Sequence, residues 1–325
     1  MIPTRDQLRA IAGVSGAARD ANIDSIIAGL SAYGVAAGLT APHRLAHFLA
    51  QIAHESGGFR FDREVWGPTP AQKGYDSRTD LGNTPAADGD GERYKGRSGI
   101  QVTGKANYAA FRDWCASRRL SPPDFVANPD AVNSDPWEGL APIWFWDTRN
   151  LNALADENNI ETLTRRINGG LNGLPDRIHL YTVAALVLLG YGAGDVATFQ
   201  TASKMAGTYV GKIDGEAGPK IRAALHKALV GMAGPAVDTS RVTAAPVVEN
   251  KPVAVVAKGS DKRGWLFWPA GGVGLGTIVT AFFDLSTSAK LSIAGVIVLL
   301  IVVMLFFGER VIRRVKALRN EIDAA

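Results

Sequence analysis

Hydrophobic residues recur every three or four positions over most of the first 190 residues, which is the period of an amphipathic α-helix. Residues 1–60 predict three helices, and the third is apolar on most sides, so we expect it to be buried. It should begin after Thr40 as N-cap, with Pro42 in its first turn, and end at Gly57-Gly58. Helical spacing returns over 105–119, 136–155, 159–168 and 176–190. The pattern predicts a mainly α domain over residues 1–190.

Residues 62–98 interrupt this helical pattern. They are rich in Gly, Pro, Asp and Asn and show little periodicity. A connection of this length is uncommon unless it has a function, so we expect a functional loop or lid here. The aromatic run Trp144-Phe145-Trp146 falls within a predicted helix, and we expect it to lie in the core.

Beyond residue 190 the chain changes character three times. Residues 195–230 predict a small helical module, in which two short helices flank a Gly-rich turn. Residues 231–263 are rich in Ala, Val, Pro and Lys without periodicity and predict a linker. Two uncharged runs then follow within residues 265–308. The second, Leu291 to Phe307, predicts a transmembrane helix, and the first is a weaker candidate because Pro269 and several glycines interrupt it.

Positive charges around these apolar runs predict their topology. Basic residues precede the first run and follow the second, in the tail 309–325, whereas Lys290 alone lies between them. The positive-inside rule then predicts a hairpin in the bacterial inner membrane, with the tail and the N-terminal domain in the cytoplasm. The N-terminal residues lack the apolar core of a signal peptide, which agrees with an initially cytoplasmic domain. In the alternative topology only Leu291 to Phe307 inserts, and the N-terminal domain lies in the periplasm.

Charge and cysteine content narrow the class of protein. The net charge is +4, but residues 1–190 hold 19 Lys and Arg against 21 Asp and Glu. This balance argues against a nucleic-acid partner, which would require a basic groove. Cys115 is the single cysteine, so no intrachain disulfide can form, and we expect it to be a small core residue.

Two glutamates are candidates for acid–base chemistry. Glu55 ends the buried third helix, where burial and the negative end of the helix dipole favour its protonated form. Glu64 lies nine positions later in the irregular segment, where it can stay ionised. Hydrolysis of a glycosidic bond needs two carboxyl groups in such contrasting environments. The spacing alone would also fit two solvated surface glutamates.

The histidines do not predict a metal site. His54-Glu55 is followed by Gly58, where a zinc-protease motif requires a second histidine. His43 and His47 lie one helical turn apart, and we favour a structural role for both over zinc binding. We expect no metal and no cofactor.

The stretch GDGERYKGRSGIQVTGKANY over residues 89–108 carries a family resemblance. Together with AHFLAQIAHESGGF, WGPTPAQKGY, DLGNT and RRINGGLNG, it resembles glycoside hydrolase family 19 in its bacterial and phage endolysin branch, over about residues 40–190. The resemblance implies a lysozyme-like α-helical catalytic domain with long irregular loops. It assigns Glu55 as general acid, Glu64 as the general base of an inverting mechanism, and Thr103 as the hydroxyl that helps hold the attacking water.

The same resemblance implies a sugar-binding groove. Its residues would be Gln101, Asn107, Tyr108, Arg166 and Asn168, and each could instead make only structural hydrogen bonds. Two features depart from the family pattern. Ser98 stands where the family usually has glycine, so the loop is strained if that position needs a positive φ, unless Gly99 adopts it instead. The disulfides of the plant branch cannot form with one cysteine.

Residues 195–230 resemble a short peptidoglycan-binding module, chiefly through GKIDGEAGP, although a plain helical extension is the alternative. The sequence therefore predicts an endolysin that hydrolyses β-1,4 bonds of bacterial peptidoglycan. Its expected partners are peptidoglycan glycan strands, the lipid bilayer and a holin. The alternatives are a chitinase acting on chitin oligomers, a lytic transglycosylase, and a membrane-acting lysis protein with a vestigial enzyme domain.

Overall fold

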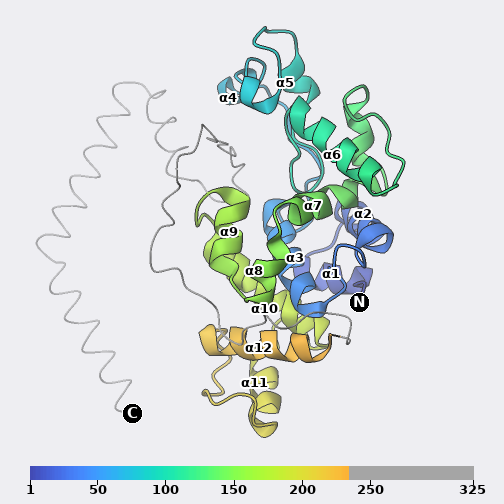
Figure 1. The fold of residues 1–325 in the computed structure, drawn as a ribbon. Helices are drawn as coiled ribbons and strands as arrows, with labels where there is room; N and C mark the ends of the chain where they lie inside the picture. The colour runs from blue at the N-terminus through green and yellow to red at the C-terminus, as the bar shows by residue number, and fades with distance from the viewer. Residues whose placement is uncertain (234–325) are drawn as a thin grey trace, which may run out of the picture. The chain divides into compact units, whose positions relative to one another are not determined.

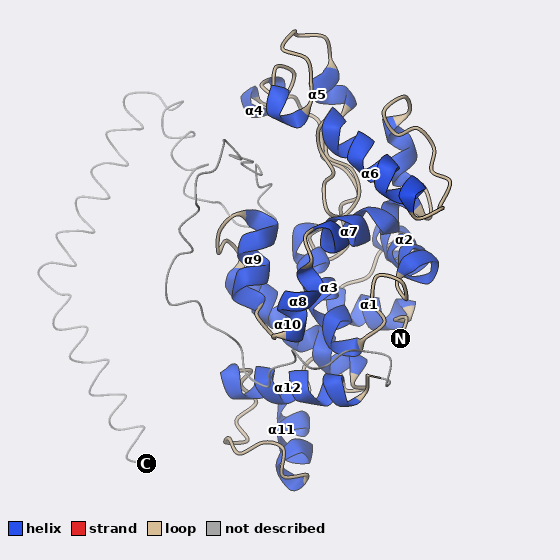
Figure 2. Ribbon diagram, in the orientation of Figure 1, coloured by secondary structure: helices blue, strands red, loops and turns tan. Residues whose placement is uncertain are grey.

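The chain is described by a computed structural model over residues 1–233, and these residues are mainly helical (Figures 1 and 2). Longer helices are joined by short helical turns and irregular loops, which confirms the predicted fold class at the level of mainly α. The α-helices are α1 (Arg5–Ala12), α2 (Ala17–Tyr33), α3 (Pro42–Glu55), α4 (Pro70–Lys73), α5 (Asp90–Arg93), α6 (Lys105–Ser117), α7 (Trp137–Thr148), α8 (Leu151–Asp156), α9 (Ile160–Asn168), α10 (Leu174–Leu188), α11 (Val196–Met205) and α12 (Pro219–Gly231). Two 3-10 helices are η1 (Thr79–Leu81) and η2 (Pro129–Asn133).

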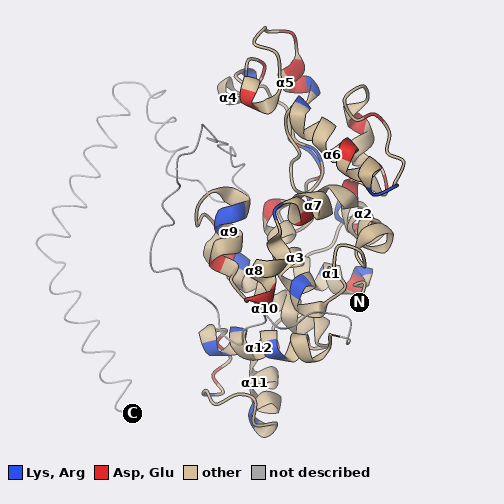
Figure 3. Ribbon diagram, in the orientation of Figure 1, with Lys and Arg blue, Asp and Glu red and all other residues tan. Residues whose placement is uncertain are grey.

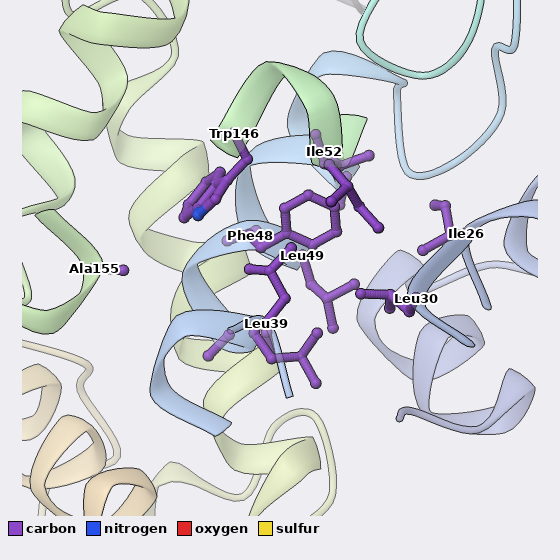
Figure 4. Close-up of a cluster of buried hydrophobic side chains, with 14 of the residues drawn as sticks. Ile26, Leu30, Leu39, Phe48, Leu49, Ile52, Trp146 and Ala155 are labelled. Carbon is purple, nitrogen blue, oxygen red and sulfur yellow. The ribbon is translucent and has the colours of Figure 1, made fainter. Parts of the chain in front are cut away.

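Helix α3 forms the centre of the core, as its apolar pattern predicts. It packs against α10, α8 and α12. Its side chains Leu45, Phe48 and Leu49 are fully buried, and Figure 4 shows Phe48 and Leu49 among residues from several helices. Full burial of each such side chain contributes about 1.5–3 kcal/mol. The N-cap is Ala41 and not the predicted Thr40, because Pro42 occupies the first helical position.

Helices α2 and α7 cross at two glycines, Gly29 and Gly139. A Cβ atom on Gly139 would lie 1.8 Å from the carbonyl oxygen of Ser25, and one on Gly29 would lie 2.2 Å from the carbonyl carbon of Gly139. The two backbones can approach this closely only because both residues lack a side chain. This crossing fixes α7 against the N-terminal helices.

The single helix predicted over 136–155 is wrong in one respect, since the structure divides it into α7 and α8. Asn150 between them adopts a left-handed backbone, with φ of 52°. Asn152 then accepts a hydrogen bond from the Trp146 indole at 2.9 Å and donates one to the Ala37 carbonyl at 2.7 Å. The core position of the aromatic run is confirmed, since Trp144, Phe145 and Trp146 are all buried. Cys115 is buried as predicted, and burial raises the pKa of its thiol to about 12.

The two helices of the predicted small module, α11 and α12, are joined to the other helices in one compact unit. Helix α12 packs on α3 and α10. His226 of α12 lies edge-on to His43, with ring centroids 5.5 Å apart. His43 and His47 have structural partners, because their Nε2 atoms lie 3.0 Å from Asp156 and 3.1 Å from Asn158.

Several predicted segments lie outside the described residues. They are the linker after residue 233, both apolar runs and the basic tail. Within residues 1–233, none of the helices has both the length and the apolar character needed to cross a membrane.

Candidate active site

Glu55 is the last residue of α3 and lies at the border of the core, as the sequence predicts. Burial of α3 fixes the backbone, and the chain then turns at Gly57 and Gly58, both of which have positive φ. The Glu55 side chain keeps 17% of its surface exposed. A carboxyl group held on a rigid helix and partly open to solvent can meet a bound substrate.

Arg177 of α10 is the main partner of Glu55. Its Nη2 donates to Glu55 Oε1 at 2.5 Å, while its Nη1 donates to the buried amide oxygen of Gln51. Its Nε donates to the Asn172 carbonyl at 3.3 Å, and the Arg177 side chain has no exposed surface. The buried guanidinium thereby fixes the position of the Glu55 carboxyl group. Within residues 1–233, no protein group donates a hydrogen bond to Glu55 Oε2.

A second side-chain contact ties the same two helices together one residue earlier. His54 Nδ1 lies 2.6 Å from Asp176 Oδ2, and this contact lowers the pKa of the Asp176 carboxyl. Gly173 has φ of 70° and packs against the His54 ring, where a Cβ atom would come within 2.2 Å. The end of α3 that carries Glu55 is thereby locked to the start of α10.

Glu64 lies in the irregular segment and is held by neutral donors. Gln72 Nε2 donates to Oε1 at 2.9 Å, and the Gly96 amide donates to Oε2 at 3.1 Å. The Tyr75 hydroxyl also bonds to it, and burial followed by the nearby Glu64 charge raises the pKa of Tyr75 to about 12. Both carboxyl oxygens of Glu64 therefore accept hydrogen bonds from uncharged donors.

The loop 96–102 contacts both chain segments that carry the two glutamates. The Glu64 amide donates to the Gly96 carbonyl at 2.8 Å, so Glu64 is paired with the start of this loop. Gly99, further along it, packs on the end of α3, since a Cβ atom there would lie 3.5 Å from Ile52 and Ser56. The loop therefore contacts both the residue after Glu55 and Glu64 itself.

Ser98 holds this loop from inside. It has φ of 64°, so it and not Gly99 adopts the left-handed backbone that the family pattern assigns to glycine. Its side chain is fully buried, and its hydroxyl donates to the Glu138 carbonyl at 2.9 Å. The hydrogen bond offsets part of the cost of this backbone conformation, which is of order 1–2 kcal/mol.

Thr103, Gln101 and Asn107 are brought together just after the loop. The Thr103 hydroxyl donates to the Gln101 carbonyl at 2.9 Å, and Asn107 donates to the Thr103 carbonyl at 2.7 Å. Gln101 has φ of 56°, and its side-chain amide bonds to the Ser98 carbonyl at 3.1 Å. All three side chains are half-buried, so each can present a polar atom to a ligand.

The other three predicted groove residues differ in their exposure. Tyr108 is fully buried, and its hydroxyl is occupied by the Lys95 carbonyl at 2.7 Å and by Arg97 at 2.6 Å, so it supports the loop from the core. Asn168 is buried and bonds within its own turn, to Gly170 and Asn172. Arg166 is exposed near the end of α9, whose basic residues Figure 3 shows, and it makes no hydrogen bond within residues 1–233.

Sequence reasoning missed the residues that position the two glutamates. Arg177 lies in a predicted helix, but only the packing of α10 on α3 brings it to Glu55. Gln72 had a detectable signal, because Thr69 and Gln72 form a capping box at the start of α4. The same glutamine side chain caps the helix with its oxygen and donates to Glu64 with its nitrogen.

A mainly helical domain that holds two partly accessible glutamates fits the class of glycoside hydrolases. The sequence family described as chitinase class I matches residues 12–162. A glycosyl hydrolase family 19 domain-containing protein of Haemophilus influenzae is 36% identical over 184 residues, which cover 49% of this chain and 87% of that protein. The chain belongs to glycoside hydrolase family 19.

Two further comparisons are with proteins that are named as chitinases. An endochitinase of Arabidopsis thaliana, At2g43610, is 32% identical over 146 residues, and the match spans 45% of this chain but only 46% of that protein. The crystal structure of chitinase C from Streptomyces griseus aligns with 59% of this chain and 78% of its own, at 24% identity and a TM-score of 0.46.

Proposed function

We propose that this glycoside hydrolase cleaves the β-1,4 bonds of bacterial peptidoglycan by an inverting mechanism. The observation that carries the proposal is the contrast between the two glutamates. Both oxygens of Glu64 accept hydrogen bonds from neutral donors, whereas Glu55 is partly exposed on a rigid helix with one oxygen bound by Arg177. Glu64 then draws a proton from water, and Glu55 protonates the leaving oxygen.

The acid step needs Glu55 to be protonated when substrate is bound. A sugar polymer bound over the site covers the remaining exposed surface of this carboxyl group and excludes water from it. The proton lies on Oε2, since Oε1 accepts from Arg177. The oxygen that faces the glycosidic bond is then the one that donates.

The Thr103 hydroxyl helps to orient the attacking water near Glu64. Gln101 and Asn107 supply donors and acceptors for sugar hydroxyls and acetamido groups. Asn168 shapes its turn, and Arg166 offers an exposed guanidinium. Tyr108 acts through the loop that it supports.

Peptidoglycan is favoured over other glycans by the C-terminal part of the sequence. Residues 195–230 resemble a wall-binding module, and the predicted membrane hairpin with its basic tail fits a lysis protein. We place the catalytic domain initially in the cytoplasm, where peptidoglycan strands become accessible after a holin or the hairpin itself opens the bilayer. Protease added to spheroplasts tests this topology. Degradation of the catalytic domain before membrane disruption would contradict it.

Chitin is the second candidate substrate, because two Arabidopsis relatives carry the name endochitinase. The deciding experiment is to incubate the full-length protein in detergent with purified peptidoglycan and, separately, with chitin oligomers. Reducing-end fragments from peptidoglycan, heavier by one water than anhydro products, support the proposal. Turnover of chitin alone would contradict it, and anhydro products would indicate a lytic transglycosylase.

A further inference from the structure

Lys95 is the residue before Gly96, which pairs with the proposed general base Glu64. Gly96 pairs with Glu64 through two hydrogen bonds, one from each backbone amide. The Lys95 carbonyl accepts from the Tyr108 hydroxyl at 2.7 Å and from Arg97 at 3.3 Å. Because these partners are buried, the backbone of Lys95 is fixed relative to Glu64.

The Lys95 side chain rests against an aromatic ring of the same segment. Its Nζ lies 5.9 Å from the ring centroid of Trp66, which follows Glu64 by two positions. The side chain keeps 23% of its surface exposed. An ammonium group held over an aromatic ring is restricted in position but still open to a ligand.

Within residues 1–233, the Lys95 ammonium group makes only a long ion pair with a protein carboxylate. The nearest carboxylate that pairs with Lys95 is Glu92 at 4.0 Å, and the Glu92 side chain is 61% exposed. Glu64 is already satisfied by Gln72, Gly96 and Tyr75. The charge of Lys95 also helps to lower the pKa of Asp130, but the Asp130 carboxylate accepts a hydrogen bond from Arg97 Nη2 at 2.6 Å. The ammonium group is therefore available to an anion in the site.

Resting on the proposed function, we propose that Lys95 binds a carboxylate on the glycan near the cleaved bond and so selects an anionic wall polymer. Chitin is uncharged, and hydroxyl and carboxamide groups suffice to recognise it. Peptidoglycan bears a lactyl-linked peptide with free carboxylates on alternate sugars. A half-buried ammonium group would donate a charge-assisted hydrogen bond to such a carboxylate, and Lys95 is a specificity residue for it.

The test compares two forms of one substrate. Peptidoglycan strands are used as isolated and after conversion of their carboxylates to methylamides, and kcat/KM is measured for full-length wild type, Lys95→Met and Lys95→Arg. Methionine keeps the apolar stem against Trp66, and arginine keeps the charge. Lys227→Met is the matched control, since it removes an exposed lysine on α12, away from α5 in Figure 1.

We expect the ratio of kcat/KM for native over methylamidated strands to fall about tenfold in Lys95→Met, as for loss of one charged hydrogen bond. The ratio should be largely retained in Lys95→Arg and unchanged in Lys227→Met, and high salt should lower it in wild type. If wild type cleaves peptidoglycan but Lys95→Met shows the same ratio, the role of Lys95 is overturned while the proposed function stands. Wild type that cleaves only chitin overturns the proposed function and this role together.

Discussion

At the scale of single residues, the central contact is the one between Arg177 and the proposed acid Glu55. A fully buried guanidinium has three acceptors around it, namely Glu55, Gln51 and the Asn172 carbonyl. Arg177 therefore positions Glu55, and the Arg177 guanidinium also donates to Gln51 and the Asn172 carbonyl. The role of Glu55 as acid depends on the free Oε2 and on the loss of solvent when substrate binds.

Replacing Glu55 by glutamine should reduce kcat by at least about a hundredfold, because the amide keeps the hydrogen bond to Arg177 but cannot give a proton. The measurement is release of reducing ends from peptidoglycan, with the unfolding transition as a check on folding. Glu216→Gln, at an exposed position between α11 and α12, is the control. Activity of Glu55→Gln within tenfold of wild type would remove Glu55 from its role.

Ser98 offers a test of the strained loop. Ser98→Ala loses the hydrogen bond to the Glu138 carbonyl and keeps the cost of a positive φ, whereas Ser98→Gly loses the bond but relieves that cost. We expect Ser98→Ala to be less stable than Ser98→Gly by about 1 kcal/mol in denaturant unfolding. Equal stabilities would mean that the backbone conformation at Ser98 carries no cost.

Single residues also show the limit of prediction from sequence. The HES and IQVTG motifs carry the predictions for Glu55 and Thr103, and RRINGG carries those for Arg166 and Asn168. The partner Arg177 lies 122 positions after Glu55 in the chain and has no local signal. The buried state of Tyr108 could not be predicted either, since it depends on Arg97 and Lys95 folding over it.

At the scale of helices and loops, the apolar periodicity predicted that a helix exists better than it predicted where the helix begins and ends. Helices α3, α6, α9 and α10 fall where the apolar spacing places them. The break between α7 and α8 was missed because Asn150 takes a left-handed conformation that the surrounding apolar pattern does not show. The short helices α4 and α5 lie within the segment that composition alone marks as irregular.

The crossing of α2 and α7 gives a prediction for a pair of elements. Gly139→Ala should destabilise the protein by at least about 2–3 kcal/mol, because the new methyl group meets backbone atoms that cannot rotate away. Gly231→Ala, where a Cβ atom meets nothing within 4 Å, serves as the helical control and should change little. Denaturant unfolding of both variants measures the difference. A Gly139→Ala protein as stable as wild type would show that the helices can separate at little cost.

At the scale of the whole molecule, a cluster of three histidines joins α12 to α3, the helix that ends at Glu55. His43 and His47 of α3 and His226 of α12 are fully buried. Burial, and then the neighbouring histidine His43, lowers the pKa of His226 to about 4, while Asp156 opposes the shift. The His47 pKa is lowered for the same main reason. Glu161 and Arg222, 4.0 Å apart, also link α9 to α12.

This cluster predicts acid sensitivity. His226 is neutral in the folded protein above about pH 4 but takes up a proton in the unfolded chain below about pH 6.5, so its contribution to stability is lost as pH falls through this window. Glu138 shifts the other way, since burial raises its pKa to about 7, and a comparison with a variant is therefore needed. Relative to His226→Gln, wild type should lose about 3 kcal/mol between pH 6.5 and pH 4. Denaturant unfolding across this range measures the difference, and a constant difference would contradict the account.

The most direct test of the account is the anomeric form of the first product. Proton NMR during cleavage of peptidoglycan strands by the full-length protein reports the configuration of the new reducing end before it equilibrates. Water driven by Glu64 onto the face opposite the leaving oxygen should give the α-anomer from a β-linked sugar, and Glu64→Gln should give almost no product. A first product with the β-anomer, or one with no reducing end, would contradict the assignment of Glu55 as acid and Glu64 as base.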